Sequence, residues 1–140
     1  METIVPYLTF KGNASEALAF YSKALDGAVT FKQTYGESPM GAGPEYNDKI
    51  MHATFKAGDL TIMASDENDQ FGNTTAGSNI SLSLNFKDEE SIEKIFQALS
   101  EGAKITMPLE DTFWGARFGM LTDKYGFHWM FNYDKEKKDK

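Results

Sequence analysis

The chain has two histidines, and each lies in an apolar stretch that is typical of a β-strand. His52 is in IMHATF and His128 is in FHWMFN. An imidazole titrates near neutral pH, so a histidine in a pocket can transfer a proton or orient a polar group of a ligand. Two interpretations stay open for His52: a catalytic, ligand-binding residue, or a strand histidine whose ring is hydrogen-bonded within the fold. For His128, pocket lining and surface exposure both stay open.

General acid–base chemistry also needs a partner acid. By sequence order the candidates are Asp66, which follows a strand, and Glu110 and Asp111, which precede TFWG. All three also fit ordinary turn or loop positions. The serine-nucleophile motif GxSxG is absent, and a chain without cysteine has no thiol nucleophile.

The segment DTFWGARFG, residues 111–119, combines large aromatic with small residues. Its glycines allow close backbone approach, and Trp114 and Phe118 can form the wall of an apolar small-molecule pocket or fill a core. Arg117 is the chain's only arginine. It is a candidate for binding an anion, although a surface position also fits.

Composition excludes several classes of protein. The chain has 140 residues, a net charge of −7 and no cysteine, which fits one domain, or two small modules sharing a core, without a disulfide framework or a thiolate zinc site. Lys and Arg do not cluster, so we expect no nucleic-acid partner. No apolar run is long enough to span a membrane, and the first residues lack the signal-peptide pattern, so we expect a cytoplasmic protein without membrane contact.

The elements that would position these residues form two similar series. The first series is a strand at 3–10, a helix within 11–27, a strand at 28–36, a loop at 37–48, and hairpin strands at 49–55 and 60–66. The second series is a strand at 79–86, a helix at 87–103, a strand at 104–111, and hairpin strands at 116–123 and 127–133.

Both predicted helices have an apolar face. The inward residues would be Ala17, Phe20, Tyr21, Ala24 and Leu25 in the first helix, and Ile92, Ile95, Phe96 and Leu99 in the second. Asn13 or Ser15 can cap the start of the first helix, and Asp26-Gly27 can end it. In the second helix, acids in the first turn complement the helix dipole.

The two series also share short sequence pairs in the same order. The pairs are Phe10-Lys11 with Phe86-Lys87, Gly27-Ala28 with Gly102-Ala103, and Lys56-x-Gly58 with Lys124-x-Gly126. We therefore predict one structural domain built from modules at 1–66 and 79–134, a linker at 67–78 and a charged tail at 135–140.

Three long segments resemble the vicinal oxygen chelate superfamily of glyoxalases, extradiol dioxygenases and bleomycin-resistance proteins, and within it the PhnB-like branch. The segments are PYLTFKGNASEALAFYSKAL, KIMHATFKAGDLTIMASD and EGAKITMPLEDTFWGARFGMLTDKYGFHWMFN. The resemblance covers about residues 4–133. It implies an α+β fold in which two β-α-β-β-β modules form a curled eight-stranded mixed sheet around a cleft, with the helices outside.

This branch often carries a label that refers to 3-demethylubiquinone methyltransferase. A methyl donor of nucleotide type usually binds at a glycine-rich turn between a strand and a helix of a parallel sheet. No GxGxxG follows a strand here. The sequence therefore argues against methyl transfer.

Metal-using members of the superfamily place His and Glu ligands at four strand positions. The resemblance carries these over to Pro6-Tyr7, Ile62-Met63, Ile80-Ser81 and Met130. None of these residues is a histidine or a carboxylate, and methionine suits only soft ions. We therefore expect no metal and no cofactor at this place.

We expect a small-molecule ligand in a cleft that lacks the superfamily's metal ligands; whether the chain is an enzyme stays open. The residues expected to line the cleft are Tyr7, His52, Met63, Ser65, Trp114, Phe118 and Met130. His52 is the candidate catalytic residue, and family analogy implies a homodimer. The alternatives are a metal-dependent lyase, isomerase or dioxygenase, a protein that sequesters a drug, and a domain that only binds a partner.

Overall fold

The structure is a computed structural model that describes residues 1–39, 41–70 and 73–135. It divides into two compact units, Met1–Thr75 and Ala76–Lys140. Parts of three predicted segments lie outside the described residues: Met40 of the loop, residues 71–72 of the linker and residues 136–140 of the tail. The exact module boundaries stay a prediction.

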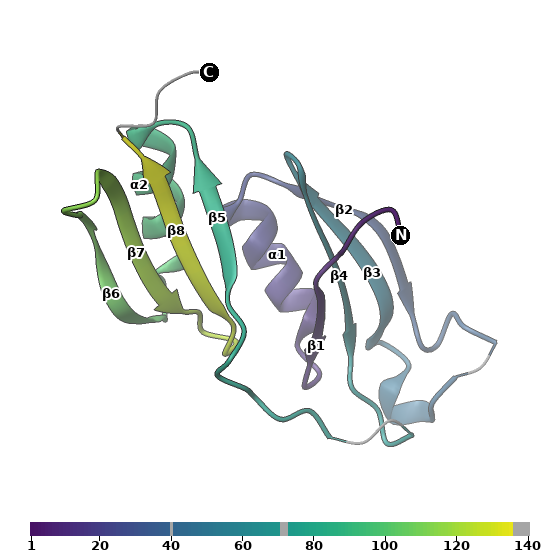
Figure 1. Ribbon diagram of the computed structural model, residues 1–140. Helices are drawn as coiled ribbons and strands as arrows, with labels where there is room; N and C mark the ends of the chain where they lie inside the picture. Colours follow the sequence, from purple (N-terminus) through teal and green to yellow (C-terminus); the bar gives the residue numbers. More distant parts are fainter. Residues whose placement is uncertain (40, 71–72, 136–140) are drawn as a thin grey trace. The chain divides into compact units, whose positions relative to one another are not determined.

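The first unit contains one helix, a short 3₁₀ turn and a four-stranded sheet (Figure 1). Its elements are β1 (Tyr7–Phe10), α1 (Ala14–Ala24), β2 (Ala28–Thr34), η1 (Pro44–Tyr46), β3 (Ile50–Ala57) and β4 (Leu60–Asp66). The strands lie in the order β1-β4-β3-β2, with β1 parallel to β4 and the other pairs antiparallel.

The second unit repeats this arrangement (Figure 1). Its elements are β5 (Leu82–Phe86), α2 (Glu89–Leu99), β6 (Lys104–Asp111), β7 (Ala116–Thr122) and β8 (His128–Asp134). The strand order is β5-β8-β7-β6, again with one parallel pair, β5 with β8. The predicted α+β fold of two β-α-β-β-β modules is confirmed, and the eight strands form two four-stranded mixed sheets, neither of which is closed.

Each core lies between a helix and one face of its own sheet. In the first unit Tyr21 of α1 is buried with Phe55 and Ile62 of the sheet. In the second unit Leu99 of α2 is buried with Trp129 and Phe131 of β8. Burial of such side chains supplies the main driving force for folding of each unit.

The start of α1 differs from the prediction in one respect. Asn13 is the N-cap residue, as predicted, but its side chain makes no capping hydrogen bond. The carboxylate of Asp66 accepts instead from the N–H groups of Gly12 and Ala14, at 3.0 and 2.9 Å. A distant acid thus satisfies backbone donors that a local side chain was expected to satisfy.

The end of α1 follows the prediction for Asp26-Gly27. Asp26 has φ +55°, and the N–H of Gly27 donates to the Ser22 carbonyl at 2.9 Å. A side chain at Gly27 has no room, because its Cβ would lie 2.5 Å from the Lys56 carbonyl oxygen. The inward face is Ala14, Ala17, Leu18, Tyr21, Ala24 and Leu25, with Phe20 only half-buried.

The predicted hairpins are present, while two strands begin at least three residues later than predicted. β3 and β4 meet at a two-residue turn in which Gly58 has φ +58°, and Gly126 has φ +93° in the turn between β7 and β8. β1 begins only at Tyr7 and β5 only at Leu82. Among the described residues, no helix is both long and apolar enough to cross a membrane.

Candidate functional site

Four of the predicted ligand-binding residues share one face of the first sheet. Along β4, Ile62 and Ala64 are buried on the side of α1, so Met63 and Ser65 point to the opposite side, which we call the open face. The register pairs Tyr7 with Met63, and it pairs Ala64 with Ala53 on β3, which places His52 beside Ser65. The open face therefore brings Tyr7, His52, Met63 and Ser65 together.

His52 and Tyr7 form a hydrogen-bonded pair on this face. The Tyr7 hydroxyl lies 3.0 Å from Nδ1 of His52, and the two rings are 5.7 Å apart. Phe31 of β2 lies on the other side of the imidazole, with a ring-to-ring distance of 6.1 Å. In a neutral ring that accepts from the tyrosine at Nδ1, the proton is on Nε2, so His52 can present a donor to a ligand.

Asp66, a candidate partner acid, has a structural role. Its side chain is 2% exposed. Besides the two bonds near α1, it accepts from the N–H of Ile50 at 2.8 Å. Three backbone donors from two segments of the chain therefore converge on one carboxylate. This arrangement fixes the start of α1 and of β3 and provides no evidence that Asp66 exchanges protons with His52.

A cavity of about 630 Å³ lies at one end of the open face. Its wall combines strand residues with the segment that follows β4. The lining residues are Tyr7, Thr9, Tyr35, Gly41, Met51, Ser65, Asp66, Glu67, Asn68, Gln70, Asn73 and Thr74. Tyr7 and Ser65 are thus the two predicted ligand-binding residues that line it.

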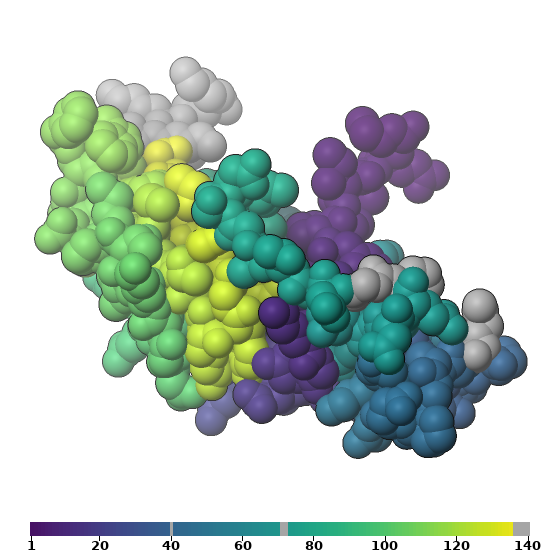
Figure 2. Space-filling model, turned by 90° about the horizontal axis from the view of Figure 1, so that it is seen from below, coloured from purple at the N-terminus to yellow at the C-terminus, as the bar shows by residue number. Residues whose placement is uncertain are grey.

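Hydrogen bonds hold the segment after β4 against the rest of the first unit. The Tyr46 hydroxyl donates to Asp69 at 2.8 Å, and Figure 2 shows the teal segment after β4 beside the blue segment around η1. The Tyr35 hydroxyl donates to the Asp66 carbonyl and accepts from the side-chain amide of Asn68, both at 2.8 Å. The hydrogen bond to Asp69 raises the pKa of Tyr46.

Glu67 brings an ionised carboxylate to the cavity wall. It accepts from the N–H of Thr74 at 2.6 Å. This backbone hydrogen bond, together with the Thr74 hydroxyl, holds the pKa of the Glu67 carboxyl below its usual range. Sequence analysis missed this residue, because it lies in a polar stretch without periodicity.

The remaining predicted ligand-binding residues lie in the second unit. Trp114 follows β6 and is 54% exposed, and its ring is 6.2 Å from the ring of Phe118 on β7. Met130 on β8 pairs with Met120, and Phe118 pairs with Asn132. Phe118 and Met130 therefore share the face of the second sheet that is opposite α2.

His128 is held by hydrogen bonds at both ring nitrogens. Nδ1 lies 2.9 Å from the Thr122 hydroxyl, and Nε2 lies 2.7 Å from the Gly77 carbonyl. Because a carbonyl only accepts, Nε2 carries the proton and the hydroxyl donates to Nδ1 in the neutral ring. The ring is half-buried. His128 is thus fixed in place by two neighbours within its own unit.

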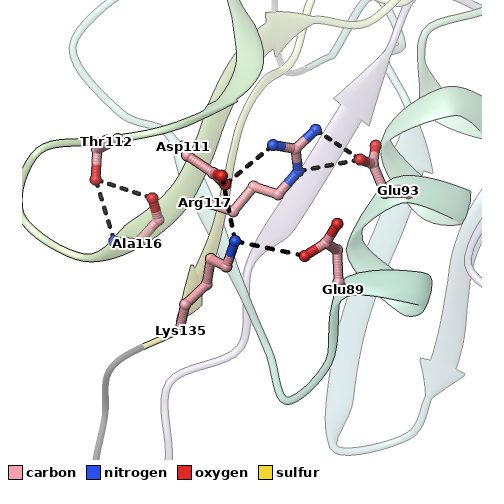
Figure 3. Close-up of polar contacts among 7 residues, drawn as sticks. All are labelled: Glu89, Glu93, Asp111, Thr112, Ala116, Arg117 and Lys135. Atoms are coloured by element: carbon pink, nitrogen blue, oxygen red, sulfur yellow. Dashed lines mark hydrogen bonds and ion pairs between the residues drawn. The ribbon is translucent and has the colours of Figure 1, made fainter.

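Arg117 is engaged in an ionic network rather than presented to an anion (Figure 3). Its guanidinium donates to Glu93 of α2 and to Asp111, at 2.6 and 3.1 Å. Lys135 donates to Asp111 at 3.2 Å and lies 3.6 Å from Glu89. The hydrogen bond from Lys135, and then that from Arg117, lowers the pKa of Asp111. The network ties β7 and the end of β8 to α2.

The donor set does not fit a hard divalent cation at the four positions implied by the resemblance. Tyr7 pairs with Met63 across β1 and β4, and the matching pair in the second unit is Ser83 with Met130. Ile80-Ser81 precede β5, which begins only at Leu82, so we add Ser83, the strand residue paired with Met130, as a candidate for the third position. These four residues offer hydroxyl and thioether groups, which are weak ligands for such ions. Among the described residues no three His, Cys, Asp or Glu side chains form a metal-binding group.

A family model, a curated relative and solved structures all match this chain over most of its length. Residues 2–131 match the family model described as 3-demethylubiquinone-9 3-methyltransferase. Protein YjdN of Escherichia coli is 33% identical, over 94% of this chain and 95% of its own length. The crystal structure of PA1353 from Pseudomonas aeruginosa is 40% identical with a TM-score of 0.84, covering 96% of this chain and 98% of that one. The PhnB protein from Bacillus cereus is 30% identical with a TM-score of 0.77, covering 94% and 99%.

The same fold also occurs in proteins with much lower sequence identity. A glyoxalase, bleomycin-resistance protein and dioxygenase domain from Frankia shares it with a TM-score of 0.72, covering 99% of this chain and 95% of that one, at 14% sequence identity. An identity this low supports the shared architecture alone.

Proposed function

The chain belongs to the PhnB-like family, described as 3-demethylubiquinone-9 3-methyltransferase, within the glyoxalase and bleomycin-resistance superfamily, and from this premise we propose that it binds a small organic molecule on the open face of its first unit. The observation that carries the proposal is the cavity of about 630 Å³ beside Tyr7 and Ser65. Ligand pockets are typically concave sites of about 300–1,000 Å³.

The wall of the cavity has the mixed chemistry of a ligand site. Tyr7, Tyr35 and Met51 offer apolar surface, while Thr9 and Ser65 offer hydroxyl groups. Tyr7 also connects the cavity to His52 through the hydrogen bond of 3.0 Å. We assign His52 the role of orienting a polar group of the ligand, and Met63 that of an apolar contact on the same face.

Trp114, Phe118 and Met130 are proposed as apolar ligand contacts of the second unit. The support is the half-exposed indole of Trp114 beside Phe118, since aromatic rings bind apolar groups well. A homodimer and a cytoplasmic location are likewise proposals, which rest on the resemblance to the superfamily and on the absence of a signal-peptide pattern.

Methyl transfer, which the family description names, has no counterpart in the local structure. The turns that lead from a strand into a helix are Lys11–Asn13 and Lys87–Asp88, and only Gly12 among these residues is a glycine. A nucleotide-type methyl donor usually requires a glycine-rich turn on a parallel sheet. We therefore propose ligand binding rather than methyl transfer.

Nuclear magnetic resonance with a library of small organic fragments tests the proposal. We expect some fragments to cause saturable shifts of the amide signals of Ser65, Asn68 and Thr74. Ser65→Trp should abolish these shifts, because the indole fills the cavity.

Thr61→Trp is the matched control. Thr61 lies on the open-face side of β4, like Ser65, but does not line the cavity. Fragment binding should survive this substitution. The proposal is wrong if no fragment shifts the lining signals in the original protein, or if a correctly folded Ser65→Trp variant binds as well as the original.

A further inference from the structure

We propose that the cavity of the first unit selects an organic cation, an amine joined to an aromatic or aliphatic body, and rejects anions such as carboxylates and phosphonates. This inference rests on the proposed function and names the ligand class of the same site. The charges on the cavity wall support it.

The charged side chains of the wall are all acidic. Glu67 and Asp66 line the cavity, although the buried Asp66 carboxylate already accepts from three backbone N–H groups, and none of the described lining residues is Lys, Arg or His. A third acid, Asp69, follows in the same segment and is held there by the Tyr46 hydroxyl. An anion entering this space would meet the like charge of Glu67 without a cation on the described wall to bind it.

The carboxylate of Glu67 stays charged and keeps capacity for a ligand. The Thr74 N–H stabilises its ionised form. A carboxylate offers about four acceptor positions, and the N–H and the hydroxyl of Thr74 use two of them. Lys11 interacts with Glu67 only through its charge and does not line the cavity.

Several hydrogen-bond donors that would be needed to hold an anion are already used inside the protein. The N–H of Gln70 donates to the Asn68 side chain and the N–H of Thr74 donates to Glu67. The Tyr35 hydroxyl donates to the Asp66 carbonyl. These three donors are therefore not available to an anion, whereas the Glu67 carboxylate can accept from an ammonium group.

The apolar part of the wall suits the body of such a ligand. Tyr7 is half exposed, and it lines the cavity together with Ser65. Aromatic rings attract cations through their π-electrons, and Met51 adds a flexible apolar surface. An aromatic or aliphatic amine combines an ammonium group with an apolar body of this kind.

The effect of charge is separated from that of shape with three probes that each contain one benzene ring. The probes are benzylammonium, benzyl alcohol and benzoate. Their binding is measured from the amide signals of Ser65, Asn68 and Thr74 at near-neutral pH. We expect benzylammonium to bind roughly fivefold more tightly than benzyl alcohol, and benzoate to bind more weakly than both. Added salt should weaken the binding of benzylammonium alone.

Glu67→Gln removes the charge while the amide oxygen can still accept from Thr74. This variant should bind benzylammonium roughly fivefold more weakly and benzyl alcohol with unchanged affinity. Glu90→Gln is the matched control, because it removes the same charge from an exposed position in the first turn of α2. It should leave the affinity for all three probes unchanged.

The outcomes distinguish the two proposals. If benzoate or benzyl alcohol binds as tightly as benzylammonium, or if Glu67→Gln has no effect, the charge inference is wrong and the cavity remains a ligand site. If none of the three probes shifts the lining signals while other fragments of the library do, the charge inference is wrong and the cavity remains a ligand site. If no fragment shifts them either, both the inference and the proposed function are overturned.

Discussion

Asp66 is the residue on which three backbone N–H groups from two segments of the first unit depend. Its buried carboxylate accepts from Gly12, Ala14 and Ile50. A buried N–H that loses its acceptor costs about 1–3 kcal/mol. One side chain therefore couples the start of α1 to the start of β3.

Replacing Asp66 by alanine should lower the free energy of unfolding by roughly 3 kcal/mol, because three backbone donors, two of them in buried hydrogen bonds, lose their acceptor. Asp66→Asn keeps one acceptor oxygen and should cost less. Asn13→Ala is the control: its side chain makes no capping bond, so we expect a loss below about 0.5 kcal/mol instead of the ~1 kcal/mol typical of a true cap. Urea unfolding monitored by circular dichroism measures all three, and equal losses for Asp66→Ala and Asn13→Ala would contradict the assignment.

At the scale of elements, the two helices begin in different ways. α2 has a local cap, because the Asp88 carboxylate accepts from the N–H of Ser91 at 2.7 Å. This hydrogen bond, followed by that of the Ser91 hydroxyl, lowers the pKa of Asp88 below 3.8. α1 depends instead on the distant Asp66.

The cap of α2 predicts a specific dependence of stability on pH. A carboxyl whose pKa is lower in the folded state stabilises the fold above its unfolded pKa, and this contribution is lost as the pH falls through the folded pKa. Asp88→Asn keeps a capping side chain that does not titrate. We expect the original protein to have a higher melting temperature than this variant at about pH 7, and the difference to vanish near about pH 2. A difference that is constant over this range would show that the Asp88 charge does not stabilise α2.

These same elements show which features of the fold can be predicted from sequence patterns. Helix periodicity, the Asp26-Gly27 stop and the glycine turns were sufficient to predict both modules, because these signals are local. The cap by Asp66 could not be predicted, because Ala14 and Asp66 are 52 residues apart in sequence.

The candidate site was predictable only in part. Strand alternation places Tyr7, Met63 and Ser65 on one face, and the register confirms their pairing. The cavity also depends on the segment with Glu67 and Asn68, whose position is set by hydrogen bonds to Thr74 and Tyr35. No periodic pattern marks such contacts, so Glu67 was not among the predicted residues.

At the scale of the whole molecule, the repeat places a separate core in each unit. In the second unit the fully buried indole of Trp129 donates to the Asp123 carboxylate at 2.8 Å. Asp123 also accepts from the N–H groups of Tyr125 and Phe127, so it organises the turn between β7 and β8. Trp129 is therefore a site at which one unit can be weakened selectively.

Trp129→Phe removes this hydrogen bond and leaves a void, and we expect it to destabilise the second unit by roughly 2–3 kcal/mol. Because proteins open in cooperative parts with their own free energies, amide hydrogen exchange should accelerate strongly in β7 and β8 and little in β3 and β4. Asp66→Ala should produce the reverse pattern, since it weakens the first unit. If either variant accelerated amide exchange equally in both sheets, the two units would unfold as one. The repeated module would then have no stability of its own.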